Sequence, residues 1–167
     1  MAKRYWLLKS EPATFSLKDL YESPNRTTCW EGVRNYQARN LLREMSVGDE
    51  AIFYHSNADP PAAVGTVRIV RAAYPDPHQF DPKSRYYDGK SKPEEPRWCA
   101  VDVAYGKAFA RPLTLPELRE VKALASMELL RKGSRLSVQP VTAAEWRVLL
   151  RLSFSRSSRR SPARRGA

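Results

Sequence analysis

The sequence predicts an α+β domain in which a mixed, partly closed β-barrel carries flanking helices. Segments rich in β-branched and aromatic residues are scattered among segments with helical spacing, without the regular alternation of a parallel β-α-β fold. The chain has 167 residues, about the size of one ordinary domain. Its hydrophobic residues make up 42% of the total, which is enough to form a core.

Four helices are predicted. Three begin with the same device, in which a Ser or Thr caps the helix and an acidic residue follows three positions later. The other is predicted from apolar residues at helical spacing over 36–45. The capped helices follow Ser16, run over 114–133, and follow Thr142 as far as Leu150. The helix over 114–133 is expected to keep its apolar side chains on one face and to end at a glycine.

Five strands are predicted from β-branched and aromatic content and from alternation of apolar and polar residues. They cover residues 5–8, 50–56, 63–74, 97–109 and 135–139. The segment 75–96 holds five Pro and reads as one long excursion from the domain. Loops of this length are uncommon in compact domains and are often functional.

The basic charge divides into two parts. The formal net charge is +11, and the last seventeen residues contain six Arg and no acid, so the body of the chain carries +5. We expect residues 1–152 to form the domain and 153–167 to be a disordered Arg/Ser-rich basic tail. The tail is expected either to bind nucleic-acid backbone or to be a solubilising extension. The tail residues predicted to contact the backbone are Arg156, Arg159, Arg160, Arg164 and Arg165.

Several classes of protein are excluded by composition. No apolar run approaches the roughly 20 residues of a membrane helix, and the first residues lack a signal-peptide pattern. Cys29 and Cys99 form no C-x-x-C pair, which fits a reducing compartment. His55 and His78 complete no zinc cluster, so no metal and no cofactor are expected.

Three segments, at 9–12, 28–36 and 53–57, are dense in groups that can recognise a planar polar ligand. The chain reads K-S-E-P at 9–12, T-T-C-W-E-G-V-R-N-Y-Q-A-R-N at 27–40, F-Y-H-S-N at 53–57 and R-L-S-V-Q-P at 135–140. With these motifs the chain resembles the EVE domain family over about residues 5–150. The resemblance implies a PUA-like fold, related to the YTH domains that read methylated adenine. It also implies a non-catalytic module that reads a modified cytosine or adenine in DNA or RNA.

A pocket with an aromatic platform is therefore expected, since reading a modified base requires it to be unstacked and held on a ring. Trp30 is the expected platform, and Gly32 would let the backbone approach the ligand. Alternation places Phe53 and His55 on one face of their strand, with Tyr54 and Ser56 on the other. The predicted ligand-binding residues are Lys9, Ser10, Trp30, Gly32, Val33, Arg34, Asn35, His55, Ser56 and Gln139.

Other interpretations stay open at this point. Trp30 could be an ordinary core residue, and Arg34 a solvated charge. The protein could be a small hydrolase of modified nucleosides, because Lys9, Cys29 and His55 include acid-base and nucleophilic groups. It could also be a protein-interaction scaffold. As a base reader it is expected to be a monomer, cytoplasmic in a bacterium or nuclear in a eukaryote, with nucleic acid as its partner and no membrane.

Overall fold

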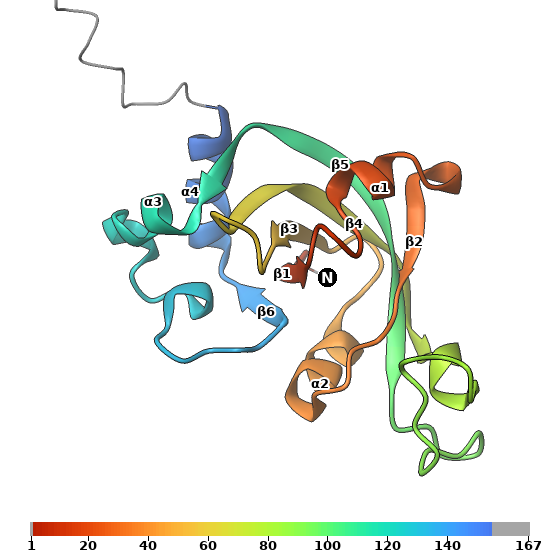
Figure 1. Cartoon of the computed structure of the whole chain (residues 1–167). Coiled ribbons are helices and arrows are strands. Elements are labelled where there is room, and N and C mark those ends of the chain that lie inside the picture. The colour runs from red at the N-terminus through yellow and green to blue at the C-terminus, as the bar shows by residue number, and fades with distance from the viewer. Residues whose placement is uncertain (1, 155–167) are drawn as a thin grey trace, which may run out of the picture.

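The computed structural model describes residues 2–154, in which six strands form one mixed sheet (Figure 1). The strand order is β2-β5-β4-β3-β1-β6. β1 and β3 are parallel, and the other neighbouring strands are antiparallel. The strands are β1 (Tyr5–Ser10), β2 (Thr27–Trp30), β3 (Glu50–His55), β4 (Ala62–Pro75), β5 (Cys99–Thr114) and β6 (Val138–Val141).

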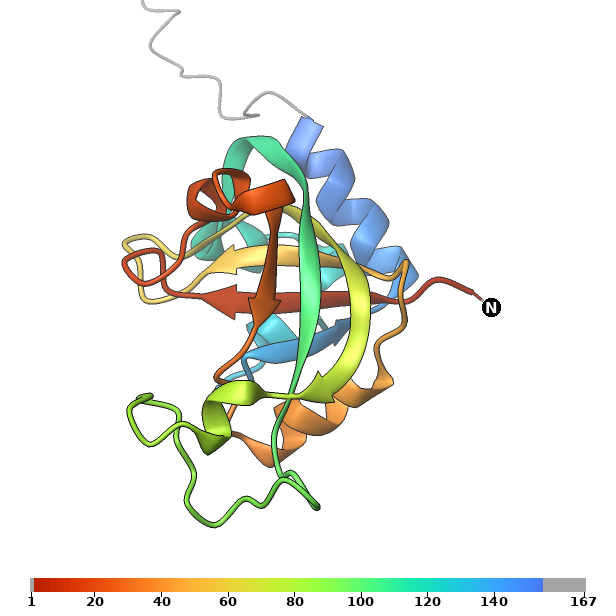
Figure 2. The ribbon, with the colours of Figure 1, turned by 90° about the vertical axis from the view of Figure 1, so that its right-hand side faces the viewer.

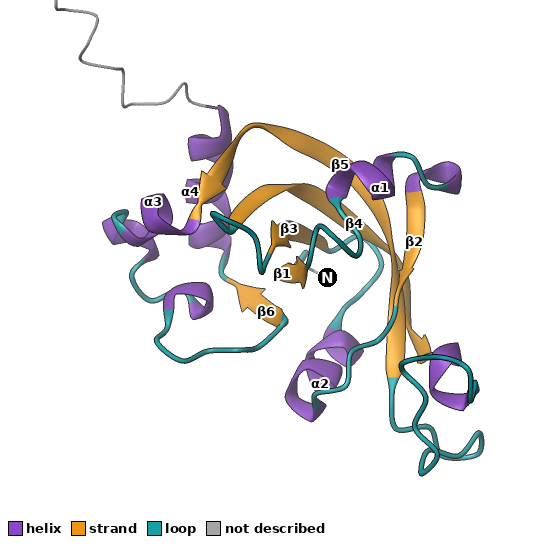
Figure 3. Ribbon diagram, viewed as in Figure 1, coloured by secondary structure: helices purple, strands orange, loops and turns teal. Residues whose placement is uncertain are grey.

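Four α-helices and four short 3-10 helices connect these strands within the described part of the chain (Figure 3). The three predicted capping pairs are confirmed, since Ser16, Thr114 and Thr142 each accept a hydrogen bond from the backbone three residues later. The helices are α1 (Leu17–Tyr21), α2 (Tyr36–Glu44), α3 (Leu115–Arg119), α4 (Ala143–Phe154), η1 (Pro24–Arg26), η2 (Pro77–Phe80), η3 (Lys122–Leu124) and η4 (Glu128–Leu130).

Buried side chains form two clusters, one on each face of the sheet. Along β1, Trp6 and Leu8 belong to the cluster that α1 and α2 cover, while Leu7 belongs to the cluster of α3 and α4. The same alternation places Phe53 in the first cluster and Tyr54 in the second, as predicted. α2 covers one face of the sheet and α4 the other, so the two helices lie well apart in the molecule, as Figure 2 shows.

The sheet is strongly bent but open. Register shifts interrupt the β3–β4 pairing once and the β4–β5 pairing at four places, and such bulges bend and twist a strand. Figure 1 shows β4 and β5 bending over β1 and β3. The expected closure into a partial barrel is not confirmed, because the edge strands β2 and β6 do not pair with each other in the described sheet.

The predicted helix over 114–133 is wrong. α3 ends at Arg119, and extended backbone at Val121 and Met127 separates it from η3 and η4. Leu118, Leu124 and Met127 are all fully or almost fully buried. A continuous helix would point Met127 away from Leu118, so breaking it lets all three side chains reach the same core.

Several boundaries and one strand also differ from expectation, since β5 continues to Thr114 and β6 covers Val138–Val141. β2 was not among the predicted strands; it is only four residues long. α4 continues to Phe154, so Ser153 and Phe154 of the predicted tail are helical. The five tail Arg lie outside the described residues. No helix of the described chain is long and apolar enough to cross a membrane.

Candidate functional site

A cavity of about 370 Å³ lies at the opening between β2 and the end of β1. This volume lies within the range of small-molecule pockets, roughly 300–1,000 Å³. Its walls come from four parts of the chain that the fold brings together. The lining residues are Lys9, Ser10, Glu11, Thr14, Phe15, Thr28, Cys29, Trp30, Glu31, Gly32, Val33, Arg34, Arg85, Tyr86 and Ser137.

The end of β1 provides one wall. The Lys9 N–H donates to the Ser137 carbonyl at 2.9 Å, and the Ser10 hydroxyl donates to the Phe15 carbonyl at 2.5 Å. The ammonium group of Lys9 has no ion-pair partner among residues 2–154. Burial lowers its pKa, and the charge of Glu128 offsets part of this effect. Lys9 is therefore a half-buried donor available to a ligand.

Trp30 belongs to the core and to the cavity at once. Its side chain is 9% exposed, and its ring meets the Phe53 ring edge-on with 5.5 Å between centroids. Trp30 is also one of the residues that line the cavity. The structure thus supports a core role for Trp30 and places the residue at the cavity wall.

Gly32 makes room for a tyrosine ring. Its φ of +83° favours glycine, and a Cβ at this position would lie 2.6 Å from Cζ of Tyr86. The Gly32 N–H donates to Oδ2 of Asp76 at 2.8 Å. A ligand was predicted to approach the Gly32 backbone closely. In the structure the Tyr86 ring takes that space, and Tyr86 itself lines the cavity.

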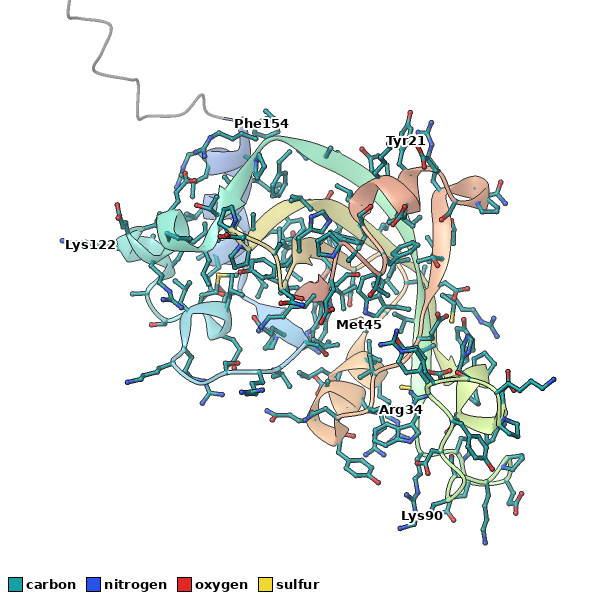
Figure 4. All side chains as sticks on the ribbon, viewed as in Figure 1. Tyr21, Arg34, Met45, Lys90, Lys122 and Phe154 are labelled. Atoms are coloured by element: carbon teal, nitrogen blue, oxygen red, sulfur yellow. The ribbon has the colours of Figure 1, made fainter. Side chains whose placement is uncertain are left out.

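Arg34 fastens the excursion 75–96 to the cavity wall (Figure 4). Its guanidinium donates to the Tyr86 carbonyl at 2.7 and 3.1 Å, to Oδ2 of Asp76 at 2.9 Å and to the Val33 carbonyl at 3.0 Å. The Asp76 side chain is fully buried. These internal bonds use most of the donors that were predicted to serve a phosphate or a base edge, so Arg34 is mainly a positioning residue.

Four predicted site residues lie outside the cavity lining. Asn35 caps α2 by accepting the Ala38 N–H at 2.9 Å, and His55 accepts the Leu17 N–H on Nε2 at 3.1 Å. The Ser56 N–H donates to the Ser10 carbonyl at 3.0 Å.

Gln139, the fourth of these residues, lies on the opposite side of the sheet. It is fully buried, and it pairs with Leu7 on the face that α4 covers. Its amide nitrogen donates to the Leu136 carbonyl at 2.8 Å. Burial and strand register therefore keep Gln139 away from the cavity.

Arg85 and Tyr86 are among the lining residues that were not predicted individually. They lie in the excursion 75–96, and its length and proline content were the only sequence signal for them. Both pictures of the whole fold show this green segment projecting beside α2 (Figures 1 and 2). The folding of the excursion onto Arg34 brings Tyr86 to the site.

The titratable groups of the site do not favour nucleophilic catalysis. Burial raises the pKa of the Cys29 thiol to about 12, so it is a neutral S–H at physiological pH. His55 uses Nε2 to hold the start of α1 and is not part of the cavity lining. The arrangement suits binding of a polar, planar group better than acid-base chemistry.

The stability of the domain is expected to fall as the pH drops through the titration of His55. Burial lowers its pKa below the ordinary 6.5, and the charge of Asp19 offsets only part of that effect. The unfolded chain therefore takes up the proton first, so this stability is present above pH 6.5 and is lost as the pH falls through the lower folded-state pKa. Protonated Nε2 could no longer accept the Leu17 N–H.

Urea unfolding from about pH 8 to about pH 5 measures this dependence. His55→Gln provides the matched control, because glutamine can accept a hydrogen bond and does not titrate. The variant should lose less stability than the wild type over the interval. Identical dependence of stability on pH in the wild type and His55→Gln would contradict the role given to His55.

Comparison with known proteins gives a consistent set of relatives. A family model described as the EVE domain matches residues 4–152. Thymocyte nuclear protein 1 from Mus musculus is 44% identical over 171 aligned residues, covering 92% of this chain and 75% of that protein.

Solved structures share the fold. A protein from Pseudomonas syringae matches with a TM-score of 0.86 and 47% identity, covering 90% of this chain and 99% of the other. The human THYN1 protein in complex with DNA containing 5-methylcytosine matches with a TM-score of 0.86 and 41% identity. That match covers 92% of this chain and 99% of the THYN1 chain.

Proposed function

Since the chain belongs to the EVE domain family, we propose that it is a non-catalytic module that binds DNA carrying a modified base, with 5-methylcytosine as the first candidate. The observation that carries the proposal is the 370 Å³ cavity at the open side of the sheet. Its lining combines aromatic residues with polar groups, as a pocket for a single base requires. The similarity to a protein solved with 5-methylcytosine DNA supports this ligand class.

In this proposal the modified base leaves its stack and enters the cavity. Trp30 and Tyr86 provide the aromatic walls, and Lys9 donates to an acceptor on the base or the adjoining phosphate. Glu31, which is exposed, can accept from the exocyclic amine of cytosine. The outer edge of β2 has no strand partner among the described strands, so its backbone groups are also available to a base edge.

Phosphate contacts would supply the rest of the affinity. We propose that the Arg of segment 155–167, which lies outside the described residues, adds salt-sensitive affinity that does not depend on sequence. Modified RNA is the alternative ligand for the same cavity. The protein would act as a monomer. It would be located in the nucleus of a eukaryote or in the cytoplasm of a bacterium, where its nucleic acid is found.

Affinity for otherwise identical oligonucleotides with plain or 5-methylated cytosine tests this function. The wild type should prefer the modified DNA by about tenfold or more, or ~1.4 kcal/mol. Lys9→Gln should lower affinity for the modified DNA by about tenfold, because a hydrogen bond from a charged group contributes roughly 1.5–3 kcal/mol.

Lys122→Gln is the matched control, since it also removes one lysine charge. Lys122 is exposed and lies far from Arg34 in Figure 4. Its replacement should change affinity by less than about twofold, as expected for a single distant charge at physiological salt. Equal wild-type affinity for plain and modified DNA and RNA would contradict the proposal.

A further inference from the structure

A continuous series of rings and guanidinium groups runs from the cavity to the surface of α2. We call it the aromatic ladder; its members are Arg85, Tyr86, Arg34, Trp98, Tyr36 and Arg39. Arg34 lies between two rings, with its Cζ 5.5 Å from the centroid of Tyr86 and 5.5 Å from that of Trp98. Tyr36 then stacks on Trp98 with 4.8 Å between centroids and 25° between planes.

The two ends of the ladder differ in exposure. Tyr86 lines the cavity, and Trp98 is 5% exposed, with its indole N–H donating to Asp88 at 2.8 Å. Tyr36, the first residue of α2, is 52% exposed. A large aromatic side chain that is held by stacking and still half open to solvent can bind another ring without first being ordered.

Positive charge accompanies this exposed ring. The Arg39 Cζ lies over the Tyr36 ring, 4.8 Å from its centroid, so an incoming base would stack against the Tyr36 ring and the Arg39 guanidinium together. Its guanidinium is fixed by bonds to Oδ1 of Asn40 and to the Arg97 carbonyl at 3.0 Å. Exposed Arg43 lies one turn further along α2. A ring held beside arginines is the combination that binds a base together with its phosphates.

We propose that Tyr36 is a second stacking site, which holds the base one or two nucleotides away from the modified base. This inference rests on the proposed function, because the cavity fixes where the strand begins. The strand would leave the cavity past Tyr86 and follow the ladder to α2, where Arg39 and Arg43 meet its phosphates. The protein would thus read a modified base and, without sequence preference, require an intact base beside it.

Single-stranded oligonucleotides that carry one 5-methylcytosine test this site. In a series, an abasic residue replaces each of the two neighbours on either side in turn. Wild-type affinity should fall roughly tenfold at one of these positions, since stacking of one base contributes about that much. Tyr36→Ala should lose the same factor on the intact oligonucleotide and should show no further loss with the abasic one.

Tyr21→Ala is the matched control. Tyr21 is 45% exposed and also has an arginine over its ring, Arg26 at 3.9 Å. It lies far from Arg34 in Figure 4 and is not part of the ladder. Tyr21→Ala should bind all the oligonucleotides as the wild type does, and Tyr36→Phe, which keeps the ring, should restore binding.

The outcomes separate this inference from the proposed function. Two results would overturn the stacking site even when the preference for 5-methylcytosine is present. In one, the wild-type affinity is the same with an abasic residue at every position. In the other, Tyr36→Ala still loses the full factor on the abasic oligonucleotide. Absence of that preference overturns the proposed function instead. If Tyr36→Ala lowers the melting temperature, Tyr36→Leu, which keeps apolar volume without a ring, decides the question in the same series.

Discussion

Replacement of Trp30 by Ala is expected to lower the free energy of unfolding by about 3–5 kcal/mol, as for other buried Trp→Ala changes. The indole is 9% exposed and packs edge-on against Phe53 in the core cluster beneath α2. Removal would leave a void in this cluster. Urea unfolding followed by circular dichroism measures the change.

Trp30→Phe is the control for this prediction, because it keeps an aromatic ring against Phe53 and removes less volume. It should cost distinctly less than Trp30→Ala. A loss below about 1 kcal/mol for Trp30→Ala would show that the ring contributes little to the core. Because Trp30→Ala is expected to perturb the fold, binding is better tested with Trp30→Phe at a temperature where it is fully folded.

Replacement of Arg34 by Met is expected to cost about 3–5 kcal/mol, the usual cost of removing one partner of a buried ion pair. Asp76 is fully buried and would lose its cation, while the carbonyl of Tyr86 would lose two hydrogen bonds. The excursion 75–96 would then separate from the 31–34 segment. Unfolding measurements and amide hydrogen exchange at Gly32 and His78, whose N–H groups bond to Asp76, would report both effects.

Arg131→Met is the matched control for Arg34→Met. Arg131 pairs with Glu128 at 3.0 Å but its side chain is 66% exposed, and exposed ion pairs contribute only about 0–1 kcal/mol. Similar losses in the two variants would mean that burial of Asp76 does not set the cost. Arg34→Met should also weaken binding of the modified base, because the Tyr86 wall depends on Arg34.

Local signals in this sequence predicted local structure well. The capping pairs at Ser16 and Thr142 mark true helix starts, because both partners lie within one turn of backbone. The pair at Thr114 marks a true start as well, but the end of that helix depends on where Leu124 and Met127 must be buried. Apolar spacing alone does not contain that information.

In the candidate site, too, contacts between residues close in sequence could be predicted and contacts between distant residues could not. Lys9, Trp30, Gly32 and Val33 lie together in the cavity lining, because the first belongs to the end of β1 and the others to the end of β2 and the residues that follow it. The internal role of Arg34 could not be predicted, since its partner Asp76 is 42 positions away in sequence. The contribution of Tyr86 could not be predicted for the same reason, since Tyr86 lies against Gly32, which is far from it in sequence.

The attachment of the excursion through Asp76 also bears on how this fold can diversify. One buried carboxylate accepts from Gly32, Arg34 and His78, so the start of the loop is fixed independently of its tip. Residues 81–83 and 89–90 are exposed and can change in composition without disturbing the strands. New ligand preferences can therefore evolve by exchanging the loop tip around Tyr86, while the anchoring carboxylate and the sheet stay the same.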